Sequence, residues 1–275
     1  MIRATVLVDD TVHRPWFRTE HGLSLYIETE AGSLLFDTGA TTLARENAEK
    51  LEVDLAGVKA VVLSHGHYDH TGGLPDILRA TGPVEVIAHP DIFRHRFAKG
   101  AGRSLREAGT PWRKREAEER GARFKLVRAP AEVFPGIHVS GEIPREAPFE
   151  KPDGRLVVRS SGALAADPLD DDLALIASGK RDLFVFLGCC HAGPANTLEH
   201  IAGLFPGRRI AAVAGGFHLL RAGEERIAKT IEYLHGLSPE VVAACHCTGF
   251  EASALFREAF GQKFIPLATG DTLEF

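Results

Sequence analysis

The chain of 275 residues is poor in several residue types, and each shortage argues against some classes of protein. It has four cysteines in two tight pairs, Cys189-Cys190 and Cys245-x-Cys247. Cysteines this close in sequence are poorly placed to bridge one another, so we expect reduced thiols and no disulfide framework. No stretch reaches 18 apolar residues, and residues 1–10 meet acids before any apolar core of signal-peptide length. We therefore expect a cytoplasmic protein without a membrane span.

Basic residues are not in excess either. The chain has 32 Lys and Arg against 37 Asp and Glu, a formal net charge of −5. Nucleic-acid-binding proteins usually carry a surplus of bases, so we expect no nucleic-acid partner. Side-chain amides are limited to Asn47, Asn196 and Gln262. This shortage is typical of thermophiles, and GC-rich coding bias explains it equally well.

The remaining composition is that of a globular protein, with 44% hydrophobic and 25% charged residues. Apolar runs bounded by Gly, Pro and Asp predict strands. These lie at 2–8, 23–29, 33–37, 59–63, 84–88, 155–159, 173–177, 182–187, 209–214, 240–244 and 264–267. Helices are predicted at 41–50, 74–80, 195–204, 223–235 and 251–260. Strands and helices alternate in both halves, which indicates an α/β fold whose second half repeats the architecture of the first.

A basic segment separates the two halves. Residues 91–128 contain twelve bases and five acids, a charge of +7 within a chain of −5. One interpretation is a solvated helix with internal ion pairs around 113–120. The other is a basic cap over a site for anions, because the planar guanidinium suits phosphate oxygens. In that second case we expect Arg94, Arg96 and Arg103 to bind the substrate.

The strongest chemical signal follows the strand predicted at 59–63. The run Ser64-His65-Gly66-His67-Tyr68-Asp69-His70 places three histidines and an aspartate within six residues. Imidazole and carboxylate ligands suit a borderline divalent ion, and this spacing can direct two donor pairs at two neighbouring ions. We expect Gly66 to let the loop turn sharply. The pattern predicts a metal site rather than a solvated histidine-rich loop.

These residues resemble the His-x-His-x-Asp-His signature of the metallo-β-lactamase superfamily, which is preceded here by Leu35-Phe36-Asp37-Thr38-Gly39. Further motifs are similar to a subgroup of small metal-dependent hydrolases that includes a dihydropterin-forming synthase of methanopterin biosynthesis. They lie at 20–24, 64–74, 188–193, 215–219 and 245–249. The resemblance implies an αββα sandwich of two mixed sheets between helical layers, with metals at one edge. We expect one such domain over 1–275, with a basic, cap-like insertion at about 91–150.

The resemblance also implies two sets of metal ligands. The first-site ligands match His65, His67 and His191. The second-site ligands match Asp69, His70 and His246. Asp37 matches a buried carboxylate that orients the metal loop through hydrogen bonds.

One ligand of the family has no obvious counterpart. The bridging aspartate is expected after His191 on the strand at 209–214, but that strand ends in Ala214-Gly215-Gly216-Phe217-His218. We therefore expect the second ion to bind more weakly than the first.

Several polar residues near these motifs have more than one interpretation. His218 is either a ligand or phosphate-binding residue in place of the lost aspartate, or a core histidine. The four cysteines flank His191 and His246, so a thiolate ligand is conceivable, although small packing residues are favoured. We expect His21, in a motif of the subgroup, to approach the site and contact the substrate.

Hydrolysis is the expected reaction, because two divalent ions activate water and neutralise developing negative charge. We predict that Asp69 accepts the proton of the water and that His218 donates a proton or holds a phosphate. The expected substrate is a small phosphorylated or nucleotide-like ester, and the expected cofactor is one or two Zn²⁺ ions, with Mn²⁺ or Fe²⁺ as alternatives. Three other functions stay open: a dihydropterin-forming condensation, an iron-dependent thiol or persulfide dioxygenase, and a non-catalytic metal- or nucleotide-binding module. A homo-oligomer is compatible with the sequence.

Overall fold

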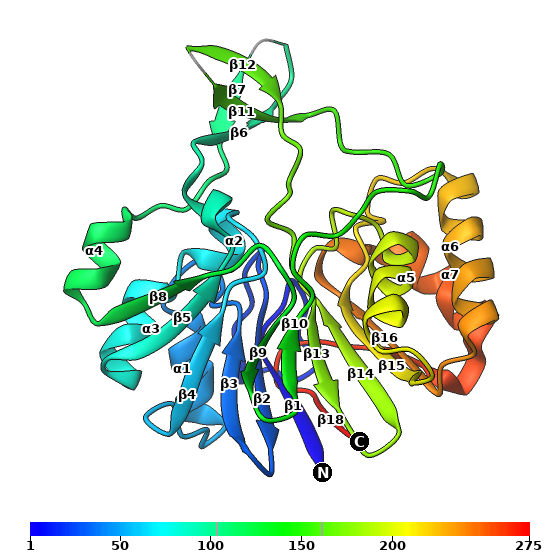
Figure 1. Ribbon diagram of the computed structural model, residues 1–275, viewed down its shortest axis with the longest axis horizontal. Coiled ribbons are helices and arrows are strands. Elements are labelled where there is room, and N and C mark those ends of the chain that lie inside the picture. Colours follow the sequence, from blue (N-terminus) through cyan, green and yellow to red (C-terminus); the bar gives the residue numbers. More distant parts are fainter. Residues whose placement is uncertain (103, 161) are drawn as a thin grey trace.

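The computed structural model describes residues 1–102, 104–160 and 162–275, and its centre is a pair of facing mixed sheets (Figure 1). The first sheet runs in the order β18 (Thr272–Glu274), β1 (Ile2–Val8), β2 (Ser24–Thr29), β3 (Gly32–Phe36), β4 (Val58–Val62), β5 (Val84–Ala88) and β8 (Ala122–Leu126). The second runs in the order β17 (Phe264–Pro266), β16 (Val241–Cys245), β15 (Arg209–Gly216), β14 (Asp182–Leu187), β13 (Leu175–Ser178), β10 (Ile137–Val139) and β9 (Ala131–Phe134).

Helices cover the outer face of each sheet. The first sheet carries α1 (Leu43–Lys50), α3 (Leu74–Thr81) and α4 (Lys114–Glu119), and the second carries α5 (Pro194–Leu204), α6 (Glu224–Leu237) and α7 (Phe250–Phe260). Shorter helical segments are α2 (Tyr68–Thr71) and the 3₁₀ turns Pro90–Phe93, His246–Thr248 and Gly261–Lys263. None of the helices in the described ranges has the length and apolar character needed to cross a membrane.

The strand pattern explains why the layers stack. In β3, Leu34 and Phe36 point into the core between the two sheets, whereas Leu35 faces α1 and α3. The second sheet packs α5, α6 and α7 against a third core, which includes Leu198 and Phe256. Alternating side chains can serve two faces only where both faces are covered. The predicted αββα fold is therefore confirmed.

Each predicted strand and helix is present, with ends that differ by no more than two residues. The basic segment is different. Its α-helix among the described residues is α4, with the expected pairs Lys114–Glu118 and Arg115–Glu119 at 3.5 and 2.7 Å, and the 3₁₀ turn Pro90–Phe93 lies at its start. The rest of the segment forms short strands, which the helix interpretation of 91–128 did not anticipate.

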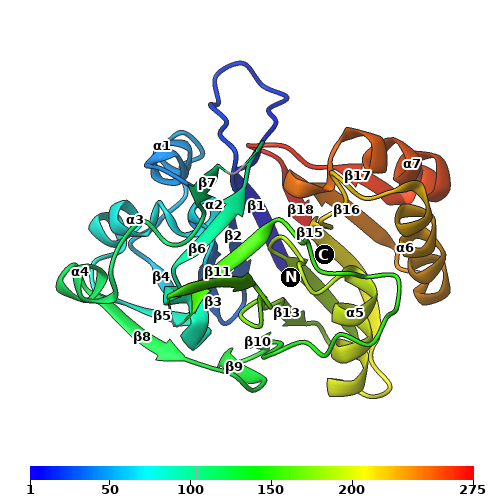
Figure 2. The same ribbon diagram turned by 90° about the horizontal axis from the view of Figure 1, so that it is seen from above.

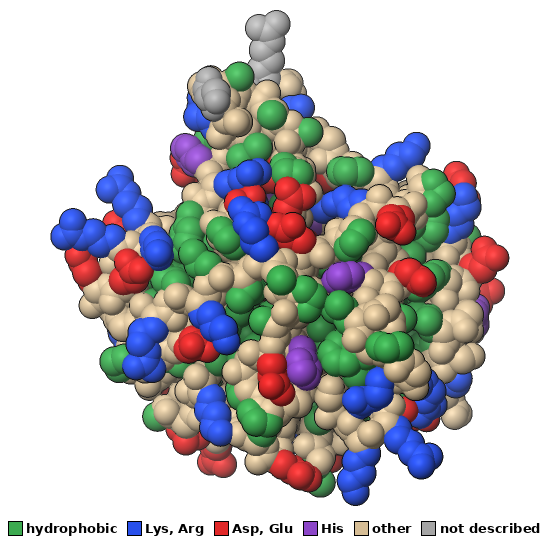
Figure 3. All heavy atoms as spheres, in the orientation of Figure 1, with side chains coloured by type: hydrophobic (Ala, Val, Ile, Leu, Met, Phe, Trp, Pro, Cys, Tyr) green, Lys and Arg blue, Asp and Glu red, His purple; other side chains and the backbone are tan. Residues whose placement is uncertain are grey.

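A third, smaller sheet rises above one edge of the sandwich (Figures 1 and 2). It consists of β12 (Ala163–Ala166), β11 (Leu156–Ser160), β6 (Arg96–Lys99) and β7 (Leu105–Glu107). Of the strands in this third sheet, the insertion predicted at about 91–150 supplies only β6 and β7, because β11 and β12 come later in the chain. The strands β8, β9 and β10 of the same segment belong to the two large sheets. Figure 3 shows this sheet projecting from the sandwich, with basic and acidic side chains mixed where the two meet.

The edge beneath this third sheet is where parallel strands of both large sheets end. The pairs β3/β4 and β14/β15/β16 are parallel, so the loops after them emerge on one side. Ligands of α/β sheets bind outside the carboxyl ends of such strands. The predicted metal ligands all lie in these loops.

Candidate metal centre

The first histidine cluster is formed by His65 and His67, after β4, and His191, after β14. Its three nitrogens converge: His65 Nε2 lies 3.0 Å from His67 Nδ1, and His191 Nε2 lies 3.2 Å from each of them. Ligands about 2.0–2.1 Å from a tetrahedral zinc ion are separated by roughly 3.3 Å. The three imidazoles therefore already have the spacing of one face of a zinc coordination sphere.

Neighbouring groups fix which nitrogen of His65 is free. Its Nδ1 lies 2.8 Å from Ser64 Oγ, which in turn donates to Asp37 Oδ2 at 2.7 Å. Because the hydroxyl proton is used on Asp37, the Ser64 oxygen accepts from His65 Nδ1. The network thus assigns the proton to Nδ1 and leaves the Nε2 lone pair facing the cluster.

Burial keeps these imidazoles neutral. It lowers the pKa of His65 and His191 well below the ordinary value, and it lowers the pKa of His67 to about 4. A neutral imidazole offers a lone pair to a metal ion, whereas a protonated one does not. His67 Nε2 and His191 Nδ1, on the far sides of the rings, are buried without a partner in the described part of the chain.

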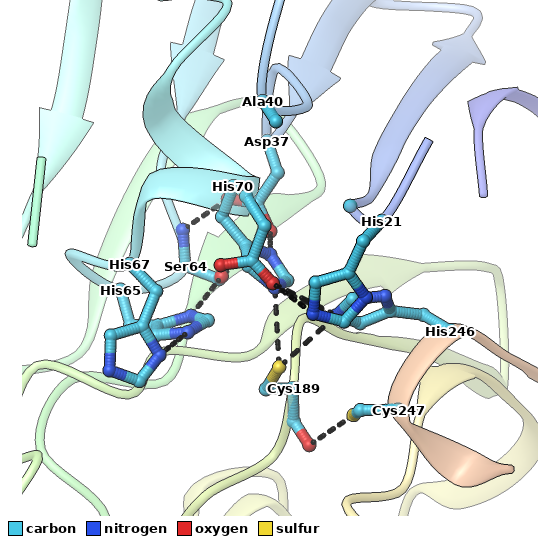
Figure 4. Close-up of polar contacts among 12 residues, drawn as sticks. His21, Asp37, Ala40, Ser64, His65, His67, His70, Cys189, His246 and Cys247 are labelled. Carbon is cyan, nitrogen blue, oxygen red and sulfur yellow. Dashed lines mark hydrogen bonds and ion pairs between the residues drawn. The ribbon is translucent and has the colours of Figure 1, made fainter. Parts of the chain in front are cut away.

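The second cluster lies beside the first (Figure 4). His70 Nε2 is 3.1 Å from His246 Nε2, and Asp69 Oδ2 is 3.7 and 3.6 Å from these two nitrogens. His246 pairs through Nδ1 with Asp10, and His70 pairs through Nδ1 with Asp37. In both rings Nε2 is therefore the atom left for an ion. The structure brings all six predicted ligands together in two adjacent groups.

Asp37 lies behind these rings and is completely buried. Its carboxylate accepts hydrogen bonds from the Ser64 amide and hydroxyl and from His70 Nδ1, each at 2.7 Å. One carboxylate thereby orients a ligand of each cluster. This is the position that the sequence motif predicted for it.

Asp10 was missed by the sequence interpretation. Its Oδ1 lies 2.6 Å from His246 Nδ1, and its Oδ2 lies 2.7 Å from His21 Nδ1. Burial raises the pKa of Asp10, but the hydrogen bonds to the two histidines outweigh burial and hold the pKa well below its usual range. Asp10 is therefore ionised at neutral pH. Its position just after β1, at the same edge as the ligands, was the available signal.

Acidic groups, including Asp10, also change the pKa of His246. Burial lowers its pKa, but the neighbouring Cys247, Asp10 and Asp69 outweigh burial and raise it to about 10. The negative charge of these groups favours a cation between the rings of the second cluster. A metal ion bound there would displace the proton.

Unusual backbone conformations accompany the ligands. Asp37, Cys190, His218 and His246 have φ angles of 62, 61, 50 and 49°, in the left-handed region that residues other than glycine rarely adopt. Each such residue costs about 1–3 kcal/mol and persists only where its surroundings enforce it. All four follow strands that end at the metal edge, so this strain is concentrated at the site.

A pocket of about 500 Å³ opens over the two clusters. Its base includes His67, Asp69, His191 and His246, and the third sheet contributes to its wall. The wall also carries five basic residues, which are Arg106, Lys151, Arg155, Arg221 and Arg226. Arg226 Nε is buried without a hydrogen-bond partner among the described residues. The pocket therefore combines a metal-binding base with positive charge.

Two of the predicted substrate arginines, Arg94 and Arg96, lie away from the pocket. Arg94 pairs with Asp91 at 3.0 Å, and neither it nor Arg96 is among the described residues that line the pocket. Arg103 lies outside the described residues. The positions of Arg94 and Arg96 do not support the predicted contact with substrate, and among the described bases of this segment Arg106 is the one that lines the pocket.

Arg96 instead supports the metal loop. It is 1% exposed and donates to Asp167 Oδ2 and to both oxygens of Asp171, each at 2.7 Å. Asp171 Oδ2 also accepts a hydrogen bond from the Gly66 amide at 2.8 Å. A Cβ atom at Gly66 would collide with the Arg96 guanidinium and the Ile92 carbonyl. Gly66 thus lies in a bend of the loop, as expected, and its lack of a side chain also permits this close approach.

The remaining predicted residues border the pocket. His21 Nε2 lies 3.4 Å from Asp69 Oδ2. The His218 ring centre is 4.2 Å from that of His191, and His218 Nδ1 is buried without a partner among the described residues. His218 is thus at the site and not in a distant core. All four cysteines are reduced and buried, and Cys189 lies beside the second cluster.

Comparisons with known proteins show what the sequence and the fold are similar to. A sequence model described as "Metallo-beta-lactamase superfamily" matches residues 18–156. A 7,8-dihydropterin-6-methyl-4-(beta-D-ribofuranosyl)-aminobenzene-5'-phosphate synthase of Methanocaldococcus jannaschii is 33% identical, over 94% of this chain and 91% of that protein. The crystal structure of Tm1679, a metal-dependent hydrolase of the beta-lactamase superfamily, shares 32% identity and a TM-score of 0.87, covering 100% of this chain and 99% of that one.

Proposed function

The chain belongs to the metallo-β-lactamase superfamily, and on that premise we propose that it is a metal-dependent hydrolase of a small phosphate-bearing ester. The observation that carries this proposal is the pair of ligand clusters at the base of a pocket with a basic wall. The ligand clusters would hold the ions that activate water, and the basic wall would bind an anionic substrate. In this proposal residues 1–275 form one domain, and the third sheet acts as its cap.

The donor atoms fit zinc, since neutral imidazoles, a carboxylate and a nearby thiol are its preferred ligands. His65, His67 and His191 would hold the first ion, and Asp69 and the histidines of the second cluster would hold the second. Two such ions supply a nucleophile by lowering the pKa of water from 15.7 to about 7, and they neutralise charge on a phosphoryl oxygen.

The side chains around the ions provide the other functions. Although burial raises the pKa of Asp69, the surrounding histidines outweigh burial and lower it, so its carboxylate is ionised and able to accept a proton. His218, with an unpartnered Nδ1 beside the pocket, is positioned to donate to a leaving group or hold a phosphate. Arg106 and Arg226 in the wall bind the anion and orient it, because guanidinium groups pair well with phosphate oxygens.

A second candidate is a synthase reaction like that of the Methanocaldococcus jannaschii relative. The 33% identity over 94% of this chain favours it. The relative's product carries a 5'-phosphate, which the same basic wall would accommodate. The two candidates therefore differ in the reaction and not in the charge of the substrate.

The test starts with protein purified without added metal. Elemental analysis should find a divalent transition metal, and that metal should support hydrolysis in a screen of phosphate monoesters and diesters. His67→Ala should abolish this activity while preserving the fold, and His235→Ala, at an exposed position, should retain it. In parallel, chromatography would follow formation of the relative's product from its pterin and aminobenzene phosphate parts.

The outcomes separate the candidates. Hydrolysis that survives in His67→Ala contradicts the proposal. Formation of the dihydropterin product without ester hydrolysis would replace the hydrolase with the synthase.

A further inference from the structure

Cys189 lies between the two histidine clusters, in the loop that follows β14. Its Sγ is 3.2 Å from His70 Nε2 and 3.4 Å from His246 Nε2 (Figure 4). These are the two nitrogens that face the second ion site. Sulfur at this separation from two imidazole nitrogens has the spacing of a third ligand to the same ion, given Zn–S of about 2.3 Å.

The same sulfur also approaches the first cluster. Sγ of Cys189 and one nitrogen each of His65 and His191 lie within 4.8 Å of one another. Within the described part of the chain, Cys189 is the one residue that belongs both to this group and to the group with His70 and His246. Its sulfur therefore lies within 4.8 Å of ligand nitrogens of both clusters.

The neighbouring strand has no side chain at its end beside the Cys189 loop. β15 ends in Gly215 and Gly216, where the sequence lacks the expected aspartate. A Cβ atom at Gly216 would lie 2.7 Å from Cys247 Sγ and 3.4 Å from Cys189 Cα. It would also collide with the Gly188 carbonyl oxygen, so a side chain at this strand end would occupy space that Cys247 and the backbone of the Cys189 loop fill.

We propose that Cys189 binds both ions as a bridging thiolate, in place of the missing carboxylate. The thiol loses its proton to solvent when the ions bind, and its sulfur forms one bond to each ion. Thiolate is a soft ligand that suits zinc and cobalt. This inference rests on the metal binding proposed above and is independent of the reaction.

Cobalt provides a readout that does not depend on activity. A thiolate bound to Co²⁺ produces a charge-transfer absorption band in the near ultraviolet, which imidazole and carboxylate ligands do not. Metal-free protein would be titrated with Co²⁺, and the band and the bound metal would be measured at one and two equivalents. We expect the band at both stages, and we expect Cys189→Ala to lose it.

Cys190 serves as the matched control, and Cys247 is tested as the rival thiolate ligand. Cys190 is adjacent in sequence, but its Sγ lies 3.3 Å from Thr197 Oγ1 in the core under α5. Cys247 donates to the Cys189 carbonyl oxygen at 3.3 Å, and its Sγ forms a further candidate group with Cys189 and His218. Cys190→Ala and Cys247→Ala should keep the band. Cys189→Ser would replace Cys189→Ala if the alanine variant fails to fold, as judged by circular dichroism without metal.

The affinities distinguish a bridge from a ligand of one ion. Loss of an outer hydrogen-bond partner weakens metal binding by about 10–100-fold, so loss of a shared ligand should raise both dissociation constants at least tenfold. A change in one constant only would refute bridging. Two bound Co²⁺ ions without a band, or a band lost only in Cys247→Ala, would overturn the assignment of Cys189. Failure to bind Co²⁺ at all would overturn both this inference and the proposed metal centre.

Discussion

Replacing Arg96 by methionine tests whether this arginine is structural or binds substrate. The substitution keeps a long apolar stem but leaves Asp167 and Asp171 buried without their cation. Removing one partner of a buried ion pair costs about 3–5 kcal/mol. A long chain loses about 2 °C of melting temperature for each kcal/mol, so Arg96→Met should lower the melting temperature by roughly 6–10 °C.

Arg94→Met is the matched control. Arg94 is partly exposed and pairs with Asp91 across one turn, an interaction that contributes about 0–1 kcal/mol. Its loss should change the melting temperature by no more than about 2 °C. Thermal unfolding followed by circular dichroism measures both variants, and elemental analysis shows whether the loop at Gly66 still retains metal.

A direct role in substrate binding gives the opposite result. Arg96→Met would then unfold at the temperature of the unmodified protein and show only a raised KM. That outcome would refute the structural role of the ion pairs to Asp167 and Asp171.

Three further predictions concern groups around the site. Asp10→Asn should weaken binding of the second ion by about 10–100-fold and leave binding of the first ion unchanged, as measured by competition with a chelator. An equal loss of affinity at both sites would contradict the selective contact with His246. Asp37→Asn should reduce stability by about 1–3 kcal/mol in urea unfolding, because a buried donor loses its acceptor, and an unchanged midpoint would refute this. Arg106→Ala should raise KM for a phosphoester more than it lowers kcat, and the increase in KM should become smaller as the salt concentration rises. An unchanged KM at low salt would show that Arg106 does not bind the substrate.

Hydrophobic patterning was sufficient to predict most strands and helices of the two large sheets, whereas the sandwich arrangement was implied by the resemblance to the metallo-β-lactamase superfamily. After Lys59 in β4 and after Asp182 in β14, every residue is apolar and most are buried, and such continuous apolar runs are typical of strands covered on both faces. The strands missed in the basic segment are three to five residues long and partly polar, as in β7, where all residues are exposed. Such short, solvated strands are defined by their partners and not by their own composition.

The charge count of the basic segment could not assign its arginines. Arg96 and Arg94 are two residues apart and chemically identical, yet one is buried and the other is partly exposed. The difference depends on Asp167 and Asp171, which lie more than 70 residues later and pack back against β6. A local sum of charges contains no information about a distant partner.

The position of the shared ligand shows why motif order alone is not sufficient. β14 and β15 are parallel neighbours with Leu187 opposite Gly215, and the Gly216 amide donates to the Gly188 carbonyl at 3.1 Å. The loops after both strands therefore emerge side by side, and either can supply an atom between the two clusters. The sequence interpretation sought a carboxylate after His191, on the later strand. The structure instead places the sulfur of Cys189 there, two residues before His191, because spatial adjacency of strand ends decides which side chain reaches the ions.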